Sequence, residues 1–173
     1  MLSGPHVARK PWSSLRGIAA TAILVAVAGP AFSAPANRPP SSAEALSLRL
    51  LKVKNNKATL KGSAPVVVTT GPEQMGYAVS IAVPEKFDRF ASCEVAATLL
   101  VKSGRITMAA LTRDQSKFVA TKQPIDPTKK PAVFTMTVAP MSDVGEILFA
   151  NAARTDDSPS VFEVSKITIG PCK

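Results

Sequence analysis

Histidine and tryptophan are each present only once in the 173 residues, as His6 and Trp12. Both lie in an N-terminal segment with the form of a secretion signal, which is removed on export. The mature chain would then contain no imidazole. This absence excludes Ser-His-Asp and Cys-His catalysis, an imidazole base and a histidine-ligated zinc ion.

Cysteine is also scarce, and the two that occur, Cys93 and Cys172, lie in the part that would be exported. An oxidising compartment and an even count predict that they form one disulfide. The chain-entropy model gives such a long loop a stabilising contribution of about 4 kcal/mol. A redox-active pair is disfavoured because the sequence has no Cys-x-x-Cys motif and the mature chain has no histidine to lower a thiol pKa.

The predicted signal combines basic residues, ending at Arg16, with an apolar run over residues 18–28. The run is shorter than the roughly 20 residues needed to span a bilayer, so we expect export to the periplasm or the extracellular space. An uncleaved membrane anchor is the alternative. Cleavage is expected after Ser33 or after Ala36, and no transmembrane segment would remain.

Cleavage after Ala36 leaves residues 37–173, enough for one domain with its own core. Residues 1–36 are thus interpreted as the signal peptide, 37–44 as a Pro- and Ser-rich linker and 45–173 as the domain. This part keeps 18 of the 21 basic residues and all 12 acidic ones. Its positive charge favours an anionic envelope polymer as partner, although solubility alone also explains it. Nucleic acid is not expected, since no Arg-rich run with interleaved aromatic residues is present.

Lysines recur near the start of the domain. A basic patch or a solvated strand edge both fit their spacing, because lysine also keeps exposed strands from pairing with other chains. The four residues are Lys52, Lys54, Lys57 and Lys61.

Residues 76–84 show the clearest strand pattern, with apolar side chains at every second position and Tyr77 on the core face. Similar patterns, separated by turn residues, mark 46–50, 57–62, 66–70, 93–101, 105–112, 134–138, 145–152 and 161–170. No long helical period occurs, and consecutive strands are too close for crossover helices. The sequence therefore predicts an all-β domain, an antiparallel β-sandwich of the jelly-roll type with eight or nine strands.

Several local features follow from this pattern. Residues 46–50 and 57–62 are expected to form a first hairpin, with a short helix beginning at Ser42 as the alternative. Ser103-Gly104 is placed as a two-residue hairpin turn. The phase of the last strand shifts near Ser165-Lys166, which predicts a β-bulge.

The part of the chain from about residue 76 to 169 resembles the galactose-binding-like, carbohydrate-binding jelly-roll modules found beside bacterial carbohydrate-active enzymes. In that pattern a strand opened by glycine ends at an acidic loop, and a late strand ends at an asparagine. The matching positions are Gly104, Asp114 and Asn151. The resemblance implies the sandwich fold and a glycan as ligand.

Two of these positions and their neighbours make up the predicted ligand site. Arg113, Asp114, Asn151 and Arg154 would form a polar, basic site suited to a glycan that bears uronate or phosphate groups. The usual aromatic platform is poorly provided for, because the mature chain has no tryptophan. Among the phenylalanines that lie near loops, burial is the expected fate, although one of them would serve as a platform if exposed. These are Phe87, Phe90 and Phe118.

Acidic residues offer two further interpretations. A glycosidase needs only two carboxylates, but Asp156 and Asp157 are adjacent in a turn, and Glu94 and Glu163 lie on strands. We therefore expect no enzyme activity. No cofactor is expected, apart from a structural calcium ion that Asp114, Asp156 and Asp157 would hold.

Two functions remain. The favoured one is an exported, non-catalytic binding module for a glycan or cell-envelope polymer. The alternative is a structural or adaptor protein of the envelope that binds another protein.

Overall fold

The fold is described from a computed structural model that places residues 42–121, 123–154 and 158–173. The predicted signal segment lies outside the described residues. The first strand begins at Glu44, the residue that we placed last in the linker. Among the described residues, no helix has the length and hydropathy to cross a membrane.

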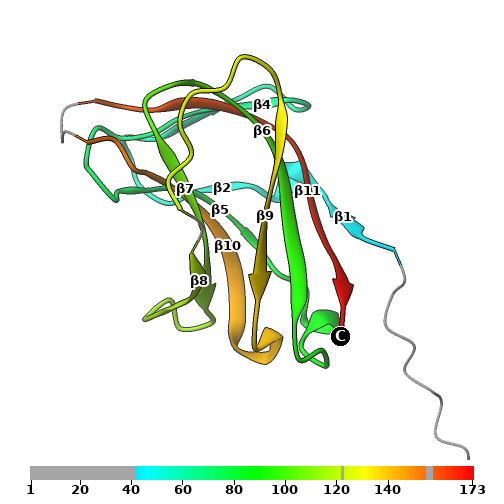
Figure 1. Cartoon of the computed structure of the whole chain (residues 1–173). Coiled ribbons are helices and arrows are strands. Elements are labelled where there is room, and N and C mark those ends of the chain that lie inside the picture. The colour runs from blue at the N-terminus through cyan, green and yellow to red at the C-terminus, as the bar shows by residue number, and fades with distance from the viewer. Residues whose placement is uncertain (1–41, 122, 155–157) are drawn as a thin grey trace, which may run out of the picture. The chain divides into compact units, whose positions relative to one another are not determined.

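Two antiparallel sheets face each other to form the domain (Figure 1). The larger one, here called the β11 sheet, has the order β3-β4-β11-β6-β9, with β1 also paired to β11. The smaller one, the β10 sheet, has the order β2-β5-β10-β7-β8. The strands are β1 (Glu44–Leu46), β2 (Lys52–Val53), β3 (Thr59–Lys61), β4 (Val66–Thr69), β5 (Tyr77–Ala82), β6 (Cys93–Ser103), β7 (Ile106–Thr112), β8 (Phe118–Thr121), β9 (Ala132–Val138), β10 (Val144–Asn151) and β11 (Val161–Cys172).

Period-two alternation in the sequence becomes the core between the sheets. Ile106, Met108 and Ala110 all face inward from β7 and are fully buried. On β9, Met136 and Val138 are buried while the intervening Thr137 is exposed. The predicted jelly-roll β-sandwich is therefore confirmed, and its core is built from the apolar positions that the pattern marks.

The strand count is higher than the predicted eight or nine, because the described residues form eleven strands, and five of them have only two to four residues. β3 lies within the predicted strand 57–62, and β1 overlaps the predicted strand 46–50 at Leu46, whereas β2 and β8 have no predicted counterpart. The bulge near Ser165-Lys166 is confirmed, since the register of β11 against β6 shifts between Val164 and Lys166.

The first predicted hairpin does not form. β1 pairs with β11, β2 with β5 and β3 with β4, so the segment divides between the two sheets. Its middle, Leu48–Leu50, is a short 3-10 helix, η1. Leu46 and Leu51 are buried, while Leu50 is 56% exposed. The two buried leucines are an odd number of residues apart, so they would not share one face of a continuous strand.

Ser103-Gly104 is not a hairpin turn either, because β6 and β7 belong to different sheets. Gly104 has a φ of 72° and passes directly over Ser160. A Cβ at this glycine would lie 2.2 Å from the Ser160 hydroxyl oxygen. Glycine is required here because the chain passes from one sheet to the other so close to Ser160 that a side chain would have no room, and because the positive φ favours glycine.

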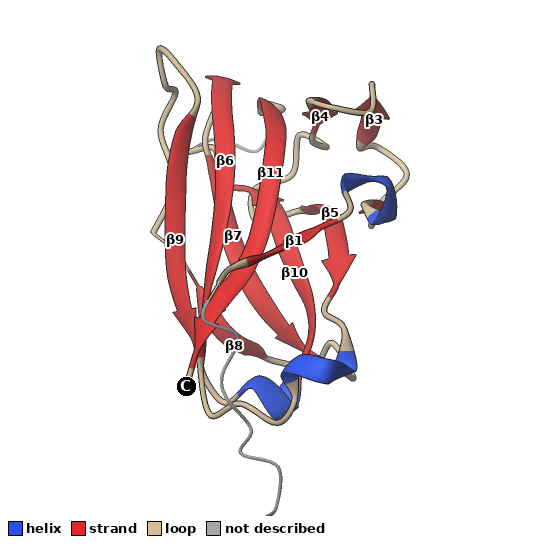
Figure 2. Ribbon diagram, turned by 90° about the vertical axis from the view of Figure 1, so that its right-hand side faces the viewer, coloured by secondary structure: helices blue, strands red, loops and turns tan. Residues whose placement is uncertain are grey.

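The sandwich has two ends that differ in how they are closed. At the disulfide end, where β10 begins, Cys93 is bonded to Cys172 as predicted. The short helices η2 (Glu85–Phe87) and η3 (Met141–Asp143) lie at this same end, near the C-terminus (Figure 2). The opposite end, where β10 finishes, is called the Asn151 end.

Candidate functional site

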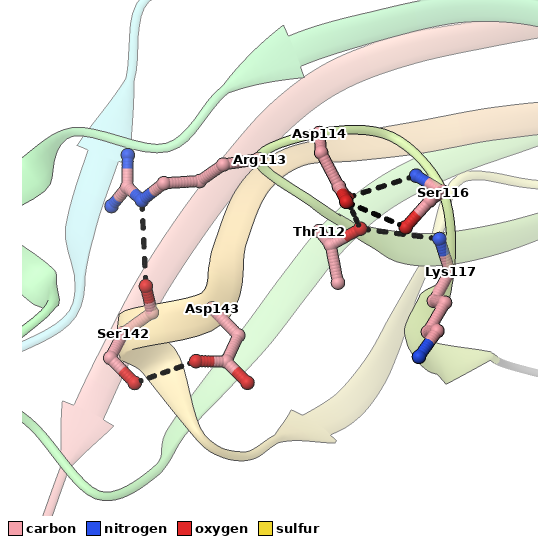
Figure 3. Close-up of a pocket in the computed structure, with 7 residues that line it drawn as sticks. All are labelled: Thr112, Arg113, Asp114, Ser116, Lys117, Ser142 and Asp143. Atoms are coloured by element: carbon pink, nitrogen blue, oxygen red, sulfur yellow. Dashed lines mark hydrogen bonds between the residues drawn. The ribbon is translucent and has the colours of Figure 1, made fainter.

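A pocket of about 440 Å³ lies at the disulfide end, between the β7–β8 turn and η3. Polar side chains from both segments surround it (Figure 3). They are Thr112, Arg113, Asp114, Ser116, Lys117, Ser142 and Asp143. Two of the predicted ligand-binding residues, Arg113 and Asp114, are therefore next to an open pocket.

Asp114 shapes the turn that borders this pocket. Its carboxylate accepts hydrogen bonds from the hydroxyls of Thr112 and Ser116 and from the Ser116 backbone N–H. These bonds, led by the one from Thr112, lower the pKa of Asp114 to about 2. Asp114 is consequently ionised at neutral pH, and its hydrogen-bonding capacity is largely used within the turn.

Arg113 on the same turn is held by the facing loops. Its guanidinium pairs with Asp88, and its Nε donates to the Ser142 carbonyl at 3.4 Å. Lys117 completes the turn and is exposed. The pocket thus combines cationic and anionic side chains, of which Arg113 is paired with Asp88 outside the lining and Asp114 is bonded within its own turn.

Asn151 lies elsewhere and is fully buried. Its Nδ2 is 3.1 to 3.2 Å from four carbonyl oxygens, and its Oδ1 accepts from the Ala153 N–H and the Ser160 hydroxyl. The four carbonyls belong to Gly71, Pro72, Glu73 and Ser158. Asn151 presents no free amide group in this structure and instead holds two loops together, while its assignment as a ligand-binding residue stays a prediction.

Arg154 is exposed just beyond Asn151. The eight residues of β10 separate this end from the pocket, a span of roughly 25 Å. The four predicted site residues therefore do not form one site: Arg113 and Asp114 lie at the disulfide end, and Asn151 and Arg154 lie at the other.

The calcium hypothesis stays a prediction. Asp156 and Asp157 lie outside the described residues. Within the residues that are described, no group of three acidic, cysteine or histidine side chains is arranged to hold a metal ion.

A second candidate surface lies on the outer face of the β10 sheet. Here Tyr77 packs on a small apolar cluster apart from the main core, which corrects its predicted place in the core. Its ring meets that of Phe118 edge to face, with 6.1 Å between centroids. Phe118 is 47% exposed, whereas Phe87 and Phe90 are buried as expected. The cluster beneath Tyr77 consists of Leu111, Leu148 and Ala150.

A row of polar groups lies on the same face. Glu146 accepts from the Ser80 hydroxyl at 2.6 Å and from Lys54 Nζ at 2.9 Å. Lys54 also donates to Gln115 Oε1 at 2.9 Å, which connects the β7–β8 turn to the sheet. We call this row, together with Tyr77 and Phe118, the outer-face site. The sequence places Ser80 opposite the core residues of β5, but the reach from Lys54 to Glu146 depends on strand order and was missed.

The lysines near the start of the domain do not form one free basic patch. Lys54 forms a salt bridge with Glu146, and Lys57 forms one with Glu73. The hydrogen bond from Lys57 also lowers the pKa of Glu73. Lys52 and Lys61 are exposed on the edge strands β2 and β3.

No protein-family model matches the sequence, and no curated protein matches it either. Among solved structures, the model is similar to a family 29 carbohydrate-binding module from Piromyces equi, at a TM-score of 0.51 and 7% identity, covering 76% of this chain and 87% of that one. A variant of a family 29 module gives a TM-score of 0.52 at 12% identity, covering 74% and 88%. A family 36 module of a xylanase from the hindgut metagenome of Trinervitermes trinervoides gives 0.54 at 8% identity, covering 76% and 99%.

The chain has the fold of a carbohydrate-binding module. At these identities the likeness concerns the fold alone, and it confirms the jelly-roll resemblance seen in the sequence. Which face of the sandwich binds, and what it binds, must be argued from this chain's own residues.

Proposed function

We propose that this chain is an exported, non-catalytic module that binds a glycan or a related cell-envelope polymer through the outer-face site. A sugar presents apolar C–H faces and a periphery of hydroxyls. A site for it needs an exposed ring beside groups that donate and accept hydrogen bonds. The half-exposed Phe118, packed edge to face against Tyr77 and directly preceded by the exposed pocket residues Ser116 and Lys117, supplies this combination, and it is the observation that carries the proposal.

The pocket at the β7–β8 turn extends the same surface. Gln115 of this turn bonds to Lys54, and Lys117 lines the pocket directly before Phe118. A chain that passes over Phe118 would therefore meet an exposed ammonium group next. This arrangement supports binding of glycans with carboxylate or phosphate groups, in line with the positive charge of the domain.

Several features support a non-catalytic role. Glu163 pairs with Lys102 at 2.6 Å, Glu94 is exposed on β6, and Asp114 is bonded within its turn. Glu146, the carboxylate of the outer-face site, already accepts from Lys54 and Ser80. Asp114 and Asp143 both line the pocket at the β7–β8 turn, but each already accepts a hydrogen bond from a neighbouring hydroxyl.

Calorimetry on a panel of neutral and acidic polysaccharides, at low and high salt, tests the proposal. Phe118→Ala is expected to weaken binding of the recognised glycan by about fivefold or more, since ring contacts of this kind contribute about 1 kcal/mol or more. Met75→Ala is the matched control, because Met75 is 49% exposed but contacts Asn151 at the far end of the sandwich.

Unchanged affinity in Phe118→Ala, with Lys54→Ala also silent, would exclude the outer-face site. A panel without any binding would exclude the glycan hypothesis itself. Weaker binding at high salt would show that charge attraction contributes to the affinity, as expected for an acidic glycan.

The alternative, an envelope adaptor that docks a protein on Lys52 and Lys54, has less support. Lys54 has a side chain only 18% exposed and is already paired with Glu146. Only Lys52 of this pair remains exposed.

A further inference from the structure

The edge strands of the sandwich differ in how well they are protected from pairing with other chains. Exposed edges are commonly shortened, charged or bulged for this reason. β2 has two residues and carries Lys52, and β3 has three and carries Lys61. β8 has four residues and a register shift opposite Leu111. Each of these three edges has at least one of the known protective devices.

β9 has none of them. It has seven residues, AVFTMTV, without a charge, a proline or a glycine. Its register against β6 is unbroken from Cys93↔Val138 to Leu99↔Ala132. In the described part of the chain, its other side makes no backbone hydrogen bond. Figure 2 shows β9 as the last strand at the margin of its sheet. β8 of the other sheet is its neighbour on that side, and Val133 of β9 is 64% exposed.

We propose that β9 is an interface for a second copy of this chain. Two copies of β9 would pair antiparallel about a two-fold axis at Thr135 and join the two β11 sheets into one. This register places Val133 opposite Thr137 on the outer face and Phe134 opposite Met136 on the inner face. Like side chains therefore share a face, and the same patch serves both copies, as a two-fold interface requires.

Charges beside the strand favour this antiparallel arrangement. Lys129 and Lys130 precede β9 and are exposed, while Asp143 follows it and is exposed. Antiparallel pairing brings the lysines of one copy toward the acidic end of the other. Parallel pairing would instead place lysines beside lysines, which is unfavourable.

The β10 sheet takes no part in this pairing, so the inference does not depend on the proposed glycan site. The test is a measurement of mass against protein concentration by analytical ultracentrifugation, with the disulfide intact. We expect a monomer–dimer equilibrium for the unmodified protein. Thr135→Lys and Thr135→Glu, each alone, are expected to weaken dimerisation by about tenfold or more, because like charges would meet on the axis.

An equimolar mixture of the two variants is the decisive sample. If Thr135 meets Thr135 across the axis, the lysine and glutamate variants will form a mixed dimer that neither forms alone. Thr59→Lys, on the edge strand β3 of the same sheet, is the matched control and is expected to dimerise normally. Both Thr135 variants are also melted thermally. A Thr135 variant that melts at the same temperature as the unmodified protein shows that loss of the dimer is not caused by loss of the fold.

Three outcomes would overturn the inference. The unmodified protein would remain monomeric at all concentrations, or the Thr135 variants would dimerise as well as the control, or the mixture would fail to form a mixed dimer.

Discussion

At the Asn151 end of the sandwich, one buried amide holds two loops together through their backbone carbonyls, whereas at the disulfide end Asp114 holds a turn together in contact with solvent. Both are short polar side chains at the end of a strand. The difference is what covers them. Loop 71–76 folds over Asn151, but only the pocket lies beside Asp114.

The contrast shows that the residue type at a strand end predicts turn chemistry, while burial decides whether that chemistry stabilises the fold or remains open to a ligand. Substitutions at the Asn151 end should then lower the stability of the fold. The disulfide end should depend on its covalent link and on pH. Three measurements separate these expectations.

Removing the disulfide is expected to have the largest effect. Cys93 and Cys172 are 79 residues apart, so the chain-entropy model predicts a loss of about 4 kcal/mol in the free energy of unfolding for the Cys93→Ala/Cys172→Ala variant. Urea denaturation of the variant and of the oxidised protein measures it. A loss below about 1 kcal/mol would mean that hydrogen bonds around Lys173 and Ser92 already close this end.

Asn151→Ala is expected to come next, with a loss of about 3 kcal/mol. The substitution leaves buried carbonyls and the Ser160 hydroxyl without their partner. Arg154→Ala is the control and should change stability by less than about 0.5 kcal/mol, because its side chain is exposed. If both variants unfold at the same urea concentration as the unmodified protein, the contrast between the ends is wrong.

The smallest effect concerns the pH dependence from Asp114. Its pKa is lowered in the folded state to about 2 from 3.8, so its contribution is present above pH 4 and is lost as the pH falls through 2. Thermal melting of the protein and of Asp114→Ala between pH 5 and 2 should show a shallower decline in the variant. If stability falls with pH equally steeply in the protein and in Asp114→Ala, the hydrogen bonds of the turn do not favour the ionised form of Asp114 over the protonated form.

Much of the fold could be predicted because alternation reports directly on burial. Ile106, Met108 and Ala110 face the core for this reason, and the bulge near Lys166 shows as a break in phase. Strand partners could not be predicted in the same way. The segments around Ser103-Gly104 look like a hairpin locally, yet β6 and β7 join different sheets.

The candidate site was harder to predict because it depends on contacts between distant residues. Burial is the expected fate of Phe118, yet the residue is 47% exposed. Tyr77 fits the phase of the core residues, but the register shift in β10 between Phe149 and Ala150 places it on the outer face. Lys54 and Glu146 are 92 residues apart, and nothing local in either segment indicates their contact.

The position of β11 has a consequence for how the protein is made. β11 follows every one of its partners in the sequence, yet it lies inside its sheet, where it pairs along its length with β6 and divides its other side between β4 and β1. A growing chain that has not yet produced β11 holds β4, β1 and β6 without the strand that joins them. Assembly of the larger sheet must therefore wait until β11, at the end of the chain, has been synthesised, whereas all five strands of the β10 sheet are made before it.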